Sequence, residues 1–218
     1  MFYRTKSHKH KDVSGIMRNI FSTLTTALTL SIATPALAAT SDGEFAVYGW
    51  GARDCNTIMT LLNGEQAAQA KAQLAEWISG FISAQNRMAE GLYDITPVKS
   101  HSPMVSLAQN ICANNPDQLF ENVVFAMVES FSALELTENS PLVQLSHNGQ
   151  AVSVNEETVR RVQKILIADG KLPTGFDDGK FGTQTALSIE AWQGEADITV
   201  NGLPDMVTLF LMAKQATQ

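Results

Sequence analysis

The sequence predicts an all-α fold made of two small helical domains, and three observations support this prediction. Apolar residues recur at helical spacing on both sides of residues 137–154, two cysteines stand far apart in the first part, and glycine-bearing loops divide the last part into three short segments. About 180 residues follow a predicted leader, enough for two small domains. We therefore expect residues 39–136 to form a disulfide-clamped helical bundle, 137–154 a linker and 155–218 a three-helix module.

Residues 1–38 have the three parts of a secretory signal peptide in the usual order. Five Lys and Arg side chains come first, an apolar and threonine-rich stretch follows over residues 20–32, and the triplet Ala36-Leu37-Ala38 fits an A-x-A cleavage signal. We expect the cut between Ala38 and Ala39. The apolar stretch is shorter than the ~20 residues that span a membrane; the alternative is a retained N-terminal membrane helix.

Removal of the leader makes the chain strongly acidic. Residues 39–218 hold 10 Lys and Arg against 21 Asp and Glu, a net charge of −11, compared with −7 for the whole sequence. Such a surface repels nucleic acid and anionic lipid head groups. We therefore expect a periplasmic or secreted protein with no nucleic-acid partner and no membrane association after cleavage.

Cys55 and Cys112 are the two cysteines of the sequence, and in an exported protein an even count predicts a disulfide. Closing a loop of this length stabilises a fold by about 4 kcal/mol on the loop-entropy account. The alternative is a metal or nucleophilic site, which requires histidines nearby. Only His101 and His147 follow the leader, neither at ligand spacing, so we expect a structural disulfide.

The segment from Glu65 to about Leu92 predicts the longest helix. Its apolar residues recur at spacings of three, four and one, which places them on one buried face: Leu74, Trp77, Ile78, Phe81 and Ile82. Trp77 and Phe81 are therefore expected in the core. Gly80 is expected to allow close packing of a neighbouring helix.

Two further helices are expected before the linker. A short one runs from Val105 to Ile111, and a longer one begins near Asn115-Pro116, because Asn is a good N-cap and Pro suits the first helical position. The disulfide would then join a first short helix at Cys55 to the end of the helix before Cys112.

Helical periodicity fades between residues 137 and 154, where Ser, Asn and Pro indicate a linker. Asn148-Gly149 stands between two short apolar segments and is typical of a type I′ turn. This part of the linker is therefore also compatible with a hairpin that packs onto the second domain.

The order of features in the first domain resembles the small two-cysteine periplasmic proteins of the acid-stress chaperone type. The resemblance covers residues 54–136 and rests on Cys55, on Trp77-x-x-Gly80-Phe81, and on Cys112 followed by Asn115-Pro116 and an amphipathic helix. It implies a chaperone activity that depends on acid-induced exposure of apolar surface.

The three helices of the second domain are delimited by local signals. The first ends near Gly170, a residue suited to the left-handed conformation that closes helices. The second runs from about Thr183 to Gln193, and Asp205 is the expected N-cap of the third. A core of this size is marginal, so each motif position matters for stability.

Four sequence blocks run through these helices: Val162-Gln163-x-x-Leu166-x-x-x-Gly170, Asp178-Gly179-x-Phe181-Gly182-x-x-Thr185, Ile189-x-x-Trp192-Gln193 and Gly202-x-x-Asp205-x-x-Thr208-x-x-Leu211. In this order they resemble the peptidoglycan-binding domain appended to many cell-wall hydrolases, over residues 153–213. The resemblance implies a ligand that is the glycan or the stem peptide of peptidoglycan. Two positions depart from the family's pattern: Ser188 replaces a small apolar residue, and Trp192 replaces the commoner Phe.

The candidate ligand-binding residues all lie within these blocks: Asp178, Phe181, Gly182, Thr185, Trp192 and Gln193. On one interpretation, the loop over 181–185 and the polar end of the second helix border a shallow groove for a wall peptide or glycan. On the other, these residues are structural, because Asp178 bonds loop amides, the glycines allow a tight loop and the aromatic rings fill the core. The alternating oxygen ligands of a calcium loop are missing, so no metal is expected.

The sequence contains no G-x-S-x-G elbow and no H-E-x-x-H motif, and both cysteines are assigned to the disulfide. We therefore expect a non-enzymatic, cofactor-free envelope protein that binds peptidoglycan and presents its first domain, with an envelope protein as a further candidate partner. One alternative is a wall-anchored periplasmic chaperone or inhibitor-like protein. Another is a cell-wall hydrolase that uses a carboxylate pair.

Overall fold

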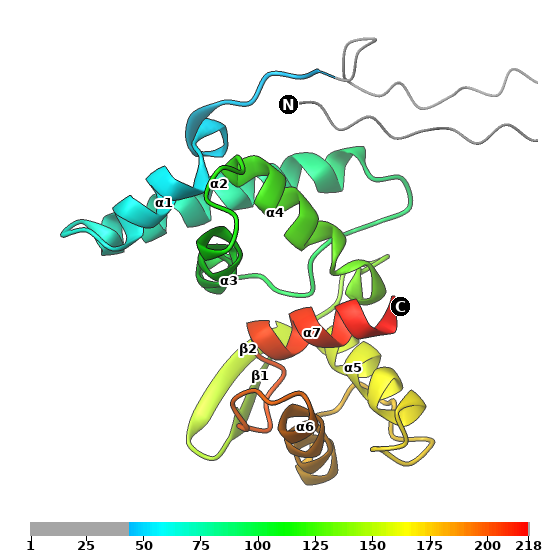
Figure 1. Ribbon diagram of the computed structural model, residues 1–218. Coiled ribbons are helices and arrows are strands. Elements are labelled where there is room, and N and C mark those ends of the chain that lie inside the picture. The colour runs from blue at the N-terminus through cyan, green and yellow to red at the C-terminus, as the bar shows by residue number, and fades with distance from the viewer. Residues whose placement is uncertain (1–43, 218) are drawn as a thin grey trace, which may run out of the picture. The chain divides into compact units, whose positions relative to one another are not determined.

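The computed structural model describes residues 44–217, which are mostly helical (Figure 1). The predicted signal peptide and its cleavage site between Ala38 and Ala39 lie outside this range. The seven α-helices are α1 (Cys55–Leu62), α2 (Ala67–Met88), α3 (Ser102–Ala113), α4 (Phe120–Glu129), α5 (Glu156–Ala168), α6 (Thr183–Glu195) and α7 (Met206–Ala216). Two short 3₁₀ helices, η1 (Gly49–Ala52) and η2 (Ser132–Leu134), and two strands, β1 (Leu142–His147) and β2 (Gln150–Asn155), complete the elements. The predicted all-α class is confirmed.

The disulfide joins α1 to α3. The Asp54 carboxylate accepts a hydrogen bond from the Thr57 N–H at 2.7 Å and so caps the start of α1. Cys55, the first residue of α1, is bonded to Cys112 near the end of α3, with the two Cα atoms 5.0 Å apart. Both cysteines are buried. The predicted pairing and its position in the fold are confirmed.

The core of the first part is built around α2. This helix buries residues at four-residue spacing, namely Ala70, Leu74, Ile78 and Ile82. Beside them, the Trp77 ring stacks on Phe81 at 5.6 Å between centroids and lies 5.7 Å from the ring of Phe120. The Trp77 indole N–H donates to the Tyr48 carbonyl at 3.1 Å. Trp77 is therefore only half-buried, at the border between the core and the chain before α1.

The glycine that the core requires is Gly51, and the expectation for Gly80 is wrong. A Cβ at position 51 would lie 2.1 Å from a ring atom of Trp77, so the backbone of η1 is in direct contact with the indole. A Cβ at position 80 would meet nothing within 4 Å. Gly80 therefore lies on an open face of α2.

The helix predicted from Asn115-Pro116 begins only at Phe120. Asn115 instead bonds the end of α3, where its side-chain amide donates to the Ile111 carbonyl at 2.8 Å. The residues at 116–118 form a turn, and Leu119 then pairs with Asp54 through an isolated bridge. Because Leu119 pairs with Asp54, α4 begins only after it, at Phe120.

The predicted linker contains the β-hairpin. β1 and β2 are antiparallel, and the turn residues Asn148 and Gly149 have φ angles of 49° and 77°, as a type I′ turn requires. At the turn, His147 Nε2 lies 3.0 Å from the Glu190 carboxylate on α6. The hairpin compatible with Asn148-Gly149 is confirmed, together with its packing on the C-terminal helices.

The two helical parts also contact each other. The Phe131 ring before η2 meets Phe210 of α7 edge-to-face at 5.8 Å. The Thr158 hydroxyl at the start of α5 donates to the Pro97 carbonyl at 3.0 Å, and Thr158 is fully buried. Residues from Ala46 onward accordingly form one compact unit. None of the helices within the described range has the length and apolar character needed to cross a bilayer.

Substitution of Gly51 by Ala tests the contact with the indole. Because the added methyl group would overlap the Trp77 ring, Gly51→Ala should lower the free energy of unfolding by about 1–3 kcal/mol. The matched control, Gly80→Ala, should raise it by about 0.5–1 kcal/mol, since position 80 is open and Ala favours helix. Urea denaturation of both variants measures the difference, and equal stabilities would contradict this packing.

Candidate functional site

A buried glutamine side chain organises the loop between α5 and α6. Gln163 of α5 is completely buried, and its Oε1 accepts the Gly179 N–H at 2.8 Å. Its Nε2 donates to the Lys180 carbonyl at 2.9 Å and to the Thr185 hydroxyl at 3.1 Å. One side-chain amide therefore satisfies a donor and an acceptor of the loop and the first turn of α6.

A second buried glutamine repeats this arrangement between α6 and α7. Gln193 of α6 is completely buried, and its Oε1 accepts the N–H groups of Asn201 and Gly202, each at 2.9 Å. Its Nε2 donates to the Leu203 carbonyl at 3.1 Å and to the Thr208 hydroxyl at 2.9 Å. In both loops, a glutamine from the preceding helix holds a glycine N–H, the next carbonyl and a threonine hydroxyl.

The two loops therefore form an internal repeat. Their glycines, Gly179 and Gly202, have φ angles of +78° and +67°, and each stands six residues before its threonine. In this left-handed region a side chain is strained. Both glycines are also closely packed: a Cβ at Gly179 would lie 3.2 Å from the Glu156 carbonyl, and a Cβ at Gly202 would lie 2.6 Å from the His147 ring.

The residue before each glycine closes the turn with its side chain. The Asp178 carboxylate accepts the Lys180 N–H at 2.8 Å, and the Asn201 side-chain carbonyl accepts the Leu203 N–H at 2.9 Å. The bond from Lys180 N–H lowers the pKa of Asp178 below its ordinary value. Asp178 therefore bonds the backbone amides of its own loop, as the structural interpretation predicted.

The other candidate residues differ in exposure. Thr185, Trp192 and Gln193 are buried, whereas Gly182 is exposed and Phe181 is half-buried. Gly182 is the N-cap of α6 in extended conformation, and a Cβ there would meet nothing within 4 Å. Trp192 belongs to the core but also lines a cavity of about 320 Å³. The polar atoms of Thr185 and Gln193 face inward to the loops, and their direct contact with a ligand stays a prediction.

Gln163 belongs to the first sequence block but was not among the six candidates. The signal for it lies in the spacing, because Gln163 follows Val159 by four residues and so falls on the apolar face of α5 with Val162 and Leu166. A polar side chain on a buried face must be hydrogen-bonded. Ser188 satisfies the same rule: its hydroxyl donates to the Lys171 carbonyl at 2.8 Å, which explains a serine at that apolar position.

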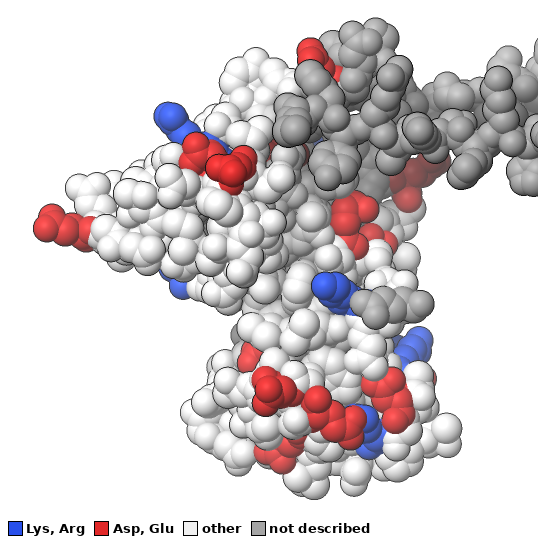
Figure 2. Space-filling view, in the orientation of Figure 1, with Lys and Arg blue, Asp and Glu red and all other residues white. Residues whose placement is uncertain are grey.

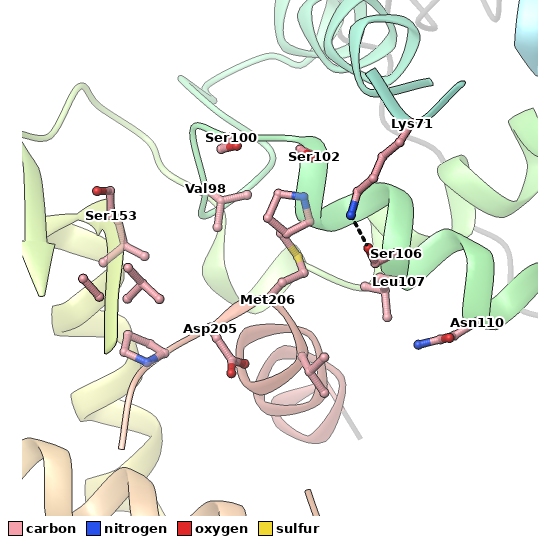
Figure 3. A pocket seen from close by; sticks show the side chains of 16 residues that line it. Lys71, Val98, Ser100, Ser102, Ser106, Leu107, Asn110, Ser153, Asp205 and Met206 are labelled. Atoms are coloured by element: carbon pink, nitrogen blue, oxygen red, sulfur yellow. Dashed lines mark hydrogen bonds between the residues drawn. The ribbon is translucent and has the colours of Figure 1, made fainter. Parts of the chain in front are cut away.

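The structure has a groove of about 600 Å³ that sequence reasoning did not anticipate (Figure 3). One wall is β2, over residues 151–154, and a second is the start of α7 over residues 204–207. The third wall is formed by α2, the loop at 98–100 and α3. Residues from both helical parts therefore line this groove.

Acidic side chains predominate over basic ones on the face drawn in Figure 2. Among residues 44–217, no group of three His, Cys, Asp or Glu side chains is placed to hold a metal ion. One charged pair lies beside Trp192: the Lys171 ammonium, in the loop after α5, is 2.7 Å from the Glu195 carboxylate at the end of α6.

Replacement of Gln163 by Leu should strongly destabilise the protein. The variant leaves the Gly179 N–H, the Lys180 carbonyl and the Thr185 hydroxyl without this partner, and unsatisfied buried groups cost about 1–3 kcal/mol each. We expect a loss of about 3 kcal/mol or more in the free energy of unfolding. Gln184→Leu, on the exposed side of α6, is the matched control and should change it by less than about 0.5 kcal/mol. A loss below about 1 kcal/mol for Gln163→Leu would contradict the role of the Gln163 side chain in holding this loop.

The part of the chain that contains Gln163 and Gln193 matches a known sequence family. No curated protein and no solved structure gives a significant match to the chain. The match to a sequence family extends from the end of β2 to α7, and so includes both glutamines and both loops. Residues 155–212 match the family described as "Putative peptidoglycan binding domain", which confirms the resemblance of the four blocks and supports peptidoglycan binding.

Proposed function

We propose that this chain is an exported, non-catalytic envelope protein that binds peptidoglycan through its C-terminal module and presents its first helical part at the wall. The observation that carries the proposal is the family match over residues 155–212. This match covers α5, α6 and nearly all of the buried residues of α7. Peptidoglycan is the ligand class, and its glycan and its stem peptide are the two chemical parts available for contact.

Two further observations support a place outside the cytoplasm. The bond between Cys55 and Cys112 is of the kind that persists in oxidising compartments. The first 38 residues have the pattern of a signal peptide. Export followed by cleavage gives a chain that begins at Ala39, and mass spectrometry of the N-terminus of the secreted protein tests this directly.

Binding to purified sacculi tests the proposed function. The chain from Ala39 to Gln218 should cosediment with sacculi. The whole chain is used because the first helical part packs on Phe210 and Thr158 of the module. An unrelated protein of similar net charge is the control for trapping in the pellet. Recovery no greater than that of the control would contradict peptidoglycan binding.

The same preparation separates a binding protein from a hydrolase. A zymogram on peptidoglycan clears only where an enzyme cuts the wall, so the non-catalytic proposal predicts no cleared band at the position of this chain. A cleared band that persists in the purified protein would instead support the carboxylate-based hydrolase.

One observation favours the second candidate function, a wall-anchored chaperone or inhibitor-like role for the first part. Burial lowers the pKa of His101, the residue before α3, below its ordinary value, while Asp94 and Glu76 oppose the shift. A histidine with a lowered pKa in the folded state favours folding above its unfolded pKa of about 6.5. This stability is lost as the pH falls from there through the folded pKa, so acid weakens the first part.

The pH dependence of unfolding tests the contribution of His101. Between about pH 7 and pH 5 the wild type should lose more of its free energy of unfolding than His101→Asn, because Asn has no proton to gain. Aggregation of a test protein at low pH, measured with and without residues 39–218, then tests chaperone activity itself. Equal pH dependence of wild type and variant would remove the support that His101 gives to this candidate.

A further inference from the structure

The strand β2 has a free edge, and this edge lies in the groove of Figure 3. Among residues 44–217 the sheet has two strands, so each strand pairs on one side alone. Four consecutive residues of β2, at 151–154, line the groove. An unpaired strand edge presents a row of main-chain donors and acceptors that an extended peptide can pair with.

The register shows which main-chain groups face the groove. His147 and Gln150 flank the two-residue turn and form a hydrogen-bonded pair, so the pairs alternate from there along the hairpin. Val152 and Val154 direct their N–H and C=O groups toward β1. Ala151 and Ser153 direct theirs away from β1, and among the described residues no other backbone group takes them up.

The opposite wall of the groove has polar side chains among apolar ones, which include Val98, Pro103 and Leu107, and it carries one cation. Figure 3 shows Lys71 and Ser106 on the side away from Ser153, with the Lys71 ammonium donating to the Ser106 hydroxyl at 2.9 Å. Ser100, Ser102 and Asn110 add further hydrogen-bonding groups to this wall. Within residues 44–217 no carboxylate forms an ion pair with Lys71. The other charged residue that lines the groove, Asp205, accepts hydrogen bonds from its own helix and loop.

Asp205 is held by its own helix and loop. One carboxylate oxygen accepts the Thr208 N–H at 2.9 Å and the other accepts the Asn201 side-chain amide at 2.7 Å. Asp205 keeps its negative charge, but both of its oxygens accept hydrogen bonds from its own helix and loop. Among the residues that the structure describes, the Lys71 ammonium donates only to the Ser106 hydroxyl, and it has donors left for the carboxylate of a ligand. In a chain with a net charge of −11 after residue 38, a groove cation that has no ion pair among residues 44–217 is a specific feature rather than a general one.

We propose that this groove binds the stem peptide of peptidoglycan, which lies in extended conformation along the free edge of β2 with a carboxylate at Lys71. The proposal rests on the proposed function and deepens it by assigning the peptide, not the glycan, as the part bound. A stem peptide is short, rich in amides and carries free carboxylates. Its amides match the strand edge and the serine hydroxyls, and its carboxylates match the cation. The groove's volume of about 600 Å³ is in the range of small-ligand sites.

Two substitutions remove these contacts separately. Ser153→Pro deletes the N–H that faces the groove without removing a bond to β1, and Lys71→Gln removes the charge. Each should weaken binding of the free stem peptide about tenfold. Gln144→Pro is the matched control, because Gln144 is paired with Ser153 and so loses an outward N–H on the other edge of the hairpin. Lys71→Arg keeps the charge and should bind within about threefold of the wild type.

The experiment uses the chain from Ala39 to Gln218 and three probes: intact sacculi, the free stem peptides that an amidase releases from them, and the denuded glycan strands that remain. Calorimetry measures the soluble peptides and cosedimentation the other two. We expect binding to intact sacculi and to free peptides, and none above control to denuded glycan. Thermal unfolding of each variant checks that it folds, and Lys71→Gln gives the answer if Ser153→Pro does not fold.

The outcomes separate the two proposals. Binding to sacculi and denuded glycan without binding to free peptides would overturn the groove assignment and leave the proposed function standing. Equal peptide binding by wild type and Lys71→Gln would also overturn the assignment. Failure to bind any of the three probes would overturn both proposals.

Discussion

Two buried side-chain amides hold the C-terminal module together, and its other features depend on them. Gln163 and Gln193 reach from one helix into the loop before the next, where each satisfies a glycine N–H, a carbonyl and a threonine hydroxyl. A three-helix core of this size buries little apolar surface, and its long loops carry backbone groups that must be paired. The amide of glutamine is suited to this because it has both donors and an acceptor. The loops are thereby fixed, and with them the starts of α6 and α7.

The loop that Gln193 holds also connects the module to the rest of the chain. Gly202 lies against His147, whose ring reaches Glu190, so the loop held by Gln193 is packed under the β-hairpin. That hairpin in turn presents β2 to the groove, opposite α3. The module thus places one strand edge beside the disulfide-clamped helices. We infer that recognition of the wall uses both parts of the chain, although the family match covers only the second.

Local signals in the sequence predicted most of the helix ends, and tertiary contacts determined the exceptions. Asp205 does cap α7, because an N-cap bond forms within four residues and needs no distant partner. The helix start predicted at Asn115 was wrong because asparagine also suits the end of a helix. The pairing of Leu119 with Asp54 joins distant segments and could not be predicted from the sequence. Helical spacing placed Gly80 on α2 without saying what lies opposite. The groove was not predictable, since four segments that are far apart in the sequence form it.

Hydrogen exchange of the full chain from Ala39 to Gln218, with and without soluble stem peptides, tests the central claim most directly. Main-chain pairing with a ligand would slow exchange of the amides at Ala151 and Ser153, whereas amides such as Gly179 and Gly202, already bonded to the glutamines, would stay as protected as before. Slowed exchange at β2 is the result that the account predicts. Unchanged exchange at β2, with protection confined to the loops after α5 and α6, would contradict it.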